Sequence, residues 1–165
     1  MREKIWGNFI RTKYQALYLS HFNSYIRTFD RIANVTVAIA SSGTIGAWLI
    51  WKEYPIVWAS ILGASQLTNI IKPFLPYLKD KQTLAESYIF YETLHLDYEK
   101  LWSEFETNED EKMATEKYFQ LRDKELQILD KLKSIKVNNN KKVERLARNE
   151  WANFLSSNYN VTVED

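Results

Sequence analysis

The chain offers few side chains whose type and spacing could support catalysis. It has no cysteine, and its two histidines, His21 and His95, fall in different predicted helices. The sequence has no GxxxxGK[ST] phosphate loop, GxGxxG, HExxH or GxSxG motif. The carboxylates between 79 and 130 lie mostly opposite an apolar stripe, as on a solvated helix face. We therefore expect no catalytic residue, no cofactor and no metal site.

Phosphate binding is the chemistry that the basic side chains could support. One basic group lies near the N-terminus and the other follows three consecutive asparagines. Arg and Lys pair with phosphates, and nearby Tyr14, Tyr18 or Trp151 could stack a base. An ordinary solvated helix face is the alternative. The candidates are Arg11, Lys13, Arg27 and Arg31 in the first group and Lys141, Lys142, Arg145 and Arg148 in the second.

Two long segments without charge stand at the centre of the chain. Residues 32–51 form a run of twenty and residues 54–71 a run of eighteen, separated by Lys52 and Glu53. A helix needs about 20 apolar residues to cross ~30 Å of hydrocarbon. The runs therefore predict an antiparallel transmembrane hairpin in the lipid bilayer. Aromatic residues surround its turn, as in an interfacial belt: Trp48, Trp51, Tyr54 and Trp58.

The basic residues beside these runs predict their orientation. Arg27 and Arg31 precede the first run, and Lys72, Lys79 and Lys81 follow the second. Because basic residues gather on the cytoplasmic side, we expect a multi-pass inner-membrane protein with both termini in the cytoplasm. A soluble bundle with two buried helices is the alternative, since each run carries about five polar side chains.

Those polar side chains must face protein or water if the hairpin lies in lipid. They either pack the helices or line a water-filled path between subunits. Two helices cannot enclose a pore, so a pore requires a homo-oligomer. The candidates for either role are Thr36, Ser41, Thr44, Ser65, Gln66, Thr68 and Asn69.

The remaining sequence predicts helices. Apolar residues recur at helical spacing over 5–29, where a helix could lie on an anionic membrane surface or pack on the C-terminal helices. A second stripe comprises Leu84, Tyr88, Tyr91, Leu94, Tyr98, Leu101 and Phe105.

Beyond that stripe, Thr107 or Asn108 predicts the N-cap of a further helix. That helix is expected to carry an apolar stripe at Tyr118, Leu121, Glu125, Ile128, Leu132 and Ile135. A loop at 138–140 and a last helix over about 141–156 complete the chain.

The predicted fold class is all-α. It combines an amphipathic cytoplasmic N-terminal helix at 1–31, a transmembrane hairpin at 32–78 and a cytoplasmic helical bundle or coiled coil at 79–165, in a homo-oligomer.

This arrangement resembles the SLATT-type two-transmembrane effectors of bacterial anti-phage conflict systems. The likeness is carried by IANVTVAIASSGTIGAWLIWKEYPIVWASILGASQLTNIIKPFLPYL through ETLHLDYEKLW. The resemblance implies a homo-oligomeric pore, a tetramer or larger, that disrupts the membrane and arrests growth. Its gating signal would be a cyclic nucleotide or DNA oligomer from a partner nucleotidyltransferase. A non-conducting membrane-anchored scaffold and a holin-like lytic protein are the alternatives.

Overall fold

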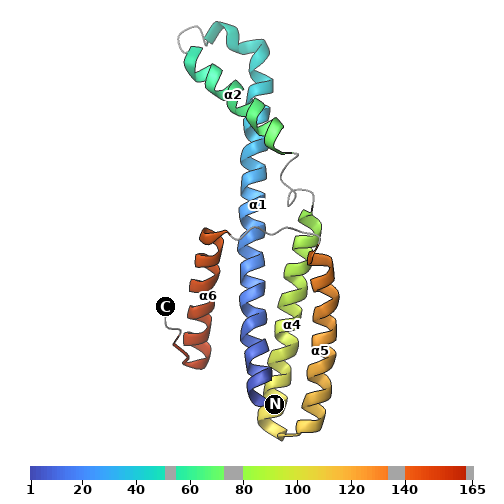
Figure 1. The fold of residues 1–165 in the computed structure, drawn as a ribbon. Helices are drawn as coiled ribbons and strands as arrows, with labels where there is room; N and C mark the ends of the chain where they lie inside the picture. The colour runs from blue at the N-terminus through green and yellow to red at the C-terminus, as the bar shows by residue number, and fades with distance from the viewer. Residues whose placement is uncertain (51–54, 73–79, 134–139, 163–165) are drawn as a thin grey trace. The chain divides into compact units, whose positions relative to one another are not determined.

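The computed structural model describes residues 1–50, 55–72, 80–133 and 140–162, with backbone alone at 42–50 and Trp58. The described chain is helical with no strand, which confirms the all-α prediction. Figure 1 labels its helices, which are α1 (Arg2–Ile50), α2 (Pro55–Ile71), α4 (Lys81–Asn108), α5 (Glu111–Lys133) and α6 (Lys141–Tyr159). They form two compact units. Unit 1 comprises Met1–Asn23 and Asp80–Asp165, and unit 2 comprises Ser24–Lys79.

The core of unit 1 follows a spacing of three and four residues along each helix. On α4 the predicted apolar stripe is buried except for Tyr88, which is partly exposed, and Ser87 joins it. Such spacing places side chains on one helix face, as in coiled coils. Most buried apolar residues of the first part of α1 show the same pattern, namely Ile5, Phe9, Ala16, Leu19 and Phe22, and Leu17 beside them is also buried.

Contacts between helices define the topology of unit 1. The pairs Arg2–Glu106 and Lys13–Glu92 show that α4 runs antiparallel to α1. The indole of Trp151 donates a hydrogen bond of 2.9 Å to the Ile10 carbonyl, which joins α6 to α1. In Figure 1, α6 and α5 lie on either side of the α1–α4 pair. The N-terminal helix therefore packs on the C-terminal helices, one of its two predicted placements.

Capping residues explain where two of the helices begin. The Asp110 side chain accepts hydrogen bonds of 3.0 Å from the backbone of Lys112 and Met113, so it caps α5. The predicted cap at Thr107 or Asn108 was wrong, because α4 continues through Asn108 before Glu109 adopts φ 50°. Asn140 caps α6 in the same way, as the predicted start at 141 required.

Unit 2 contains the C-terminal part of α1 and all of α2. The ammonium of Lys72 lies 3.2 Å from an Asp30 carboxylate oxygen and 2.5 Å from the Asn34 amide oxygen. These contacts join the end of α2 to α1. Helix α1 runs without a break from Arg2 to Ile50, and no Gly or Pro occurs between 8 and 42 to end it.

The predicted membrane localisation was also wrong. No helix within the described residues is both long enough and apolar enough to cross a membrane. The 17 residues of α2 rise about 26 Å, short of the ~30 Å hydrocarbon core. Several features assigned to the hairpin lie outside the described residues, namely Lys52, Glu53 and the side chains of the aromatic belt at its turn.

Candidate functional site

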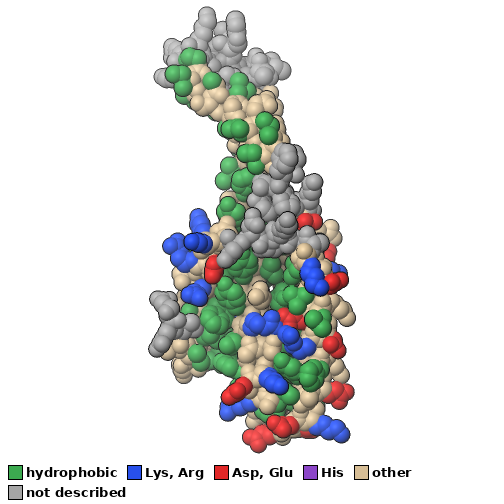
Figure 2. Space-filling model, in the orientation of Figure 1, with side chains coloured by type: hydrophobic (Ala, Val, Ile, Leu, Met, Phe, Trp, Pro, Cys, Tyr) green, Lys and Arg blue, Asp and Glu red, His purple; other side chains and the backbone are tan. Residues whose placement is uncertain are grey.

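Exposed apolar side chains gather in unit 2. Of the eighteen large hydrophobic residues exposed in the described chain, eleven belong to this unit. Figure 2 shows green apolar side chains along the visible face of α2. We call this set the apolar surface of unit 2; it consists of Tyr25, Phe29, Ile32, Val35 and Ile39 on α1 and Ile56, Val57, Leu62, Leu67, Ile70 and Ile71 on α2.

The spacing of these residues places several of them on one face of each helix. Along α1, Tyr25, Phe29 and Ile32 follow at intervals of four and three. Along α2, Leu67 and Ile70 are three residues apart and share a face. Extended apolar surface of this kind marks binding sites for protein or other apolar partners.

Charge is absent from the helical stretches that carry most of this surface. Residues 32–41 and 55–71 contain no Asp, Glu, Lys or Arg. Contact with another surface here would bury no ionised group, so apolar burial would not be offset by the desolvation of charges.

The polar residues predicted to line a pore or pack helices occupy different environments in unit 2. The hydroxyl of Thr36 donates to the Ile32 carbonyl at 2.9 Å. Ser41 and Thr68 donate to the carbonyl four residues earlier in the same way. Such bonds satisfy a hydroxyl within its own helix.

Three further candidates from that set have described side chains. Ser65 is buried, whereas Gln66 and Asn69 are exposed. The side chain of Thr44 lies outside the described residues. The exposed amides of Gln66 and Asn69 therefore interrupt the apolar face of α2 with hydrogen-bonding groups.

The structure separates the basic residues predicted to bind phosphates. Arg11 pairs with Glu125 at 2.7 Å and Lys13 pairs with Glu92 at 3.1 Å. Both cations are therefore engaged within unit 1. Arg27 and Arg31 are exposed in unit 2. The other four candidates are exposed on α6, namely Lys141, Lys142, Arg145 and Arg148.

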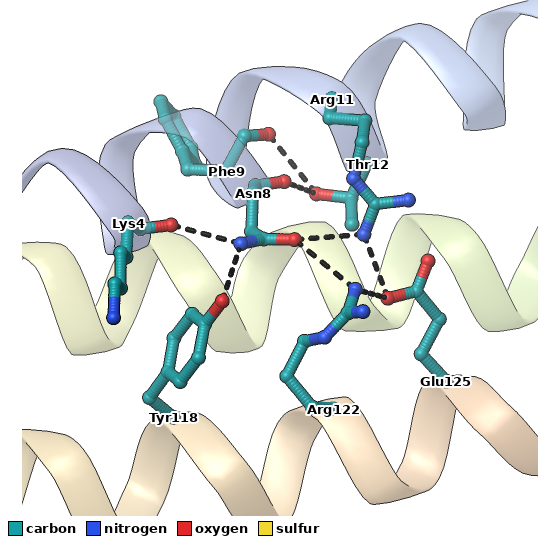
Figure 3. Close-up of polar contacts among 8 residues, drawn as sticks. All are labelled: Lys4, Asn8, Phe9, Arg11, Thr12, Tyr118, Arg122 and Glu125. Atoms are coloured by element: carbon teal, nitrogen blue, oxygen red, sulfur yellow. Dashed lines mark hydrogen bonds and ion pairs between the residues drawn. The ribbon is translucent and has the colours of Figure 1, made fainter.

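A buried carboxylate joins helices α1 and α5 of unit 1 (Figure 3). Glu125 of α5 is 1 % exposed, and one of its oxygens accepts hydrogen bonds of 2.7 Å from both Arg11 and Arg122. The Arg11 guanidinium also donates to the Asn8 side chain, whose amide donates to the Tyr118 hydroxyl. The sequence signal for this cluster was Glu125 itself, an acidic residue inside an apolar stripe.

This cluster is built for structure and not for proton transfer. Glu125 is held by two guanidiniums, which remain charged in proteins. Burial and, to a smaller extent, the negative charge of Glu125 together raise the pKa of Tyr91 to about 12. Burial likewise raises the pKa of Tyr98, so both phenols stay protonated near neutral pH.

His95 is also part of the core and not a ligand site. Its side chain is 2 % exposed and stacks on Phe9 with ring centroids 4.7 Å apart. Nδ1 lies 3.2 Å from the Phe9 carbonyl oxygen. Burial lowers the pKa of His95, and the positive charge of Lys13 lowers it further. Within the described residues, no group of three or more His, Asp or Glu side chains could hold a metal ion.

Comparison with protein-family models, curated proteins and solved structures found no match to the chain.

Proposed function

We propose that the chain is a helical assembly protein, in which the apolar surface of unit 2 binds further copies of the same chain. In the assembly each copy would present its own unit 1. This role corresponds to the scaffold among the alternatives above, without its membrane anchor. The exposure of the eleven apolar side chains of unit 2 is the observation that carries the proposal.

Burial of this surface is strongly favourable. Removing an exposed Ile or Leu side chain from water contributes about 1.5–3 kcal/mol. Residues such as Ile32, Ile56 and Ile70 are each exposed over more than half of their surface. Several such side chains contribute enough to offset the loss of translational and rotational freedom on association, about 4–15 kcal/mol.

A second copy is the occupant that this surface favours. Charges that would select a foreign partner are missing from 32–41 and 55–71. An isologous contact places the same patch on both subunits, which needs only self-complementary shape. The exposed amides of Gln66 and Asn69 can pair across such a contact and fix its register, as buried Asn does in coiled coils.

Size-exclusion chromatography with light scattering on the full chain tests the proposal. We expect the wild type to elute as a dimer or larger species, and Ile70→Glu to elute as a monomer. Ile89→Glu is the matched control, since Ile89 is 61 % exposed on α4 of unit 1 and Ile70 is 60 % exposed. Equal dissociation by both variants contradicts the proposal, and so does a monomeric wild type that partitions into lipid vesicles.

A further inference from the structure

An aromatic pocket lies in unit 1 among the start of α1 and the ends of α4 and α6. Its cavity volume is about 450 Å³, and it is lined by Arg2, Glu3, Trp6, Trp102, Tyr159 and Val161. The centre of the Trp6 ring lies 5.1 Å from that of the Trp102 ring and 5.2 Å from that of the Tyr159 ring. The volume is in the range of small-molecule sites, about 300–1,000 Å³.

One cation already uses this pocket. The guanidinium carbon of Arg2 lies 5.5 Å from the centre of the Trp102 ring, within reach of a cation–π contact. Two hydrogen bonds to Glu106, of 2.7 and 3.0 Å, hold the guanidinium there. The Arg2 side chain is 66 % exposed, so little packing keeps it in place.

The charges around the pocket favour a cation. Glu3 at its rim forms no ion pair with any described residue. A second cavity of about 580 Å³ shares Arg2 and is lined also by Met1, Phe105, Glu106, Glu109 and Glu111. Across the two cavities Glu106 is paired with Arg2 and Glu111 with the N-terminal ammonium, which leaves Glu3 and Glu109 as the acidic side chains in excess. The faces of aromatic rings also carry negative potential.

We propose that the pocket binds an organic ammonium group, which takes the place that Arg2 occupies over Trp102. The ammonium group would stack on the rings of Trp6 and Trp102 with Glu3 as its counter-ion. Arg2 would move off the ring together with the Glu106 side chain, which is 38 % exposed. The same chemistry is offered by a small quaternary amine and by a trimethylated lysine side chain of a peptide.

Isothermal titration of the full chain with choline tests the role of charge. The control ligand is 3,3-dimethyl-1-butanol, which has the same shape and no charge. We expect choline to bind and the neutral alcohol to bind more weakly. Equal binding of both ligands, or no binding of choline by any variant, overturns the proposal.

Variants test the role of Arg2. We expect Arg2→Gln to strengthen choline binding about two- to fivefold, because it removes the competing cation from the Trp102 ring. A gain of binding cannot come from misfolding. Lys4→Gln, which removes an exposed cation two residues away, should leave the affinity unchanged. Trp102→Leu and Glu3→Gln should both weaken binding, and an Arg2→Gln variant that binds no tighter than Lys4→Gln overturns the proposal.

The source of the ammonium group is distinguished by a second ligand series. A short peptide with trimethyllysine that binds more tightly than choline indicates a protein partner. Equal affinities for the peptide and choline indicate a small amine. A trimethyllysine peptide that binds no better than the same peptide with norleucine contradicts recognition of the ammonium group.

Discussion

Arg11 of α1 and Glu125 of α5 form an ion pair of 2.7 Å in which the carboxylate is almost fully buried. Arg122, one turn before Glu125 on α5, contacts the same carboxylate oxygen at 2.7 Å. The buried charge of Glu125 therefore links α5 to Arg11, which lies far earlier in the sequence. Removing one partner of a buried charge pair leaves the other without compensation. Glu125 therefore specifies how α5 packs on α1.

Replacing Glu125 tests this packing. We expect Glu125→Gln to lower the free energy of unfolding by about 2 kcal/mol, the scale of hydrogen bonds to a charged group. Arg11→Gln should cost less, because Arg122 still pairs with Glu125. Urea denaturation followed by circular dichroism measures both. Glu104→Gln, which removes a partly exposed pair with Lys117, is the control and should change stability less than Glu125→Gln. Equal effects of the Glu125 and Glu104 variants would contradict this role for Glu125.

The hydroxyl of Tyr98 provides a second test of the core. This oxygen is buried and has no hydrogen-bond partner among the described residues. Tyr98→Phe should therefore stabilise the fold by about 1 kcal/mol, since it removes a polar group that folding desolvates. Tyr118→Phe is the matched control and should destabilise the fold, because Asn8 donates to its hydroxyl at 2.9 Å. A loss of stability in Tyr98→Phe would show that its hydroxyl is satisfied in solution.

Buried His95 predicts how stability depends on pH. Its pKa in the folded state is lowered below the ordinary value of 6.5, so the unfolded chain binds the proton more readily. The free energy of unfolding should therefore fall as pH drops below about 6.5. We expect His95→Gln to reduce this dependence between pH 7.5 and 5.5, about one unit either side of the free imidazole value, by urea denaturation at each pH. An unchanged slope in His95→Gln would contradict this assignment.

Cross-linking tests the proposed interface at single residues. Because the chain has no cysteine, one introduced thiol reports on its own position without background. We expect Ile70→Cys to form disulfide-linked dimers on mild oxidation, since the proposed contact places α2 beside another copy. Ile89→Cys, on unit 1, should remain monomeric on denaturing gels. Comparable cross-linking at both positions would indicate random collision and no interface.

Periodicity predicted much of unit 1. The stripe of α4 from Leu84 to Phe105 and the start of α6 at Lys141 follow from spacing and from the preference of Asn for the N-cap. The start of α5 was missed, because Thr107, Asn108 and Asp110 are all good caps by type. Only the positive φ of Glu109 selects Asp110 among them.

The role of unit 2 and the aromatic pocket could not be predicted from local sequence patterns, because both depend on how distant residues pack together. Charge-free runs are compatible with a membrane span, a buried core or an exposed association surface. The length of α2, 17 residues, argues against a membrane span, and this length is known only from the structure. The aromatic pocket joins Trp6, Trp102 and Tyr159 from three helices. No local pattern in the sequence brings such residues together.

Sedimentation equilibrium of the full wild-type chain tests the central claim most directly. One chain has a mass of 19.6 kDa. Association through the apolar surface of unit 2 predicts a mass at a whole multiple of this value, with Ile70→Glu reduced to a single chain and Ile89→Glu unchanged. A wild-type mass of 19.6 kDa at every concentration would contradict the account.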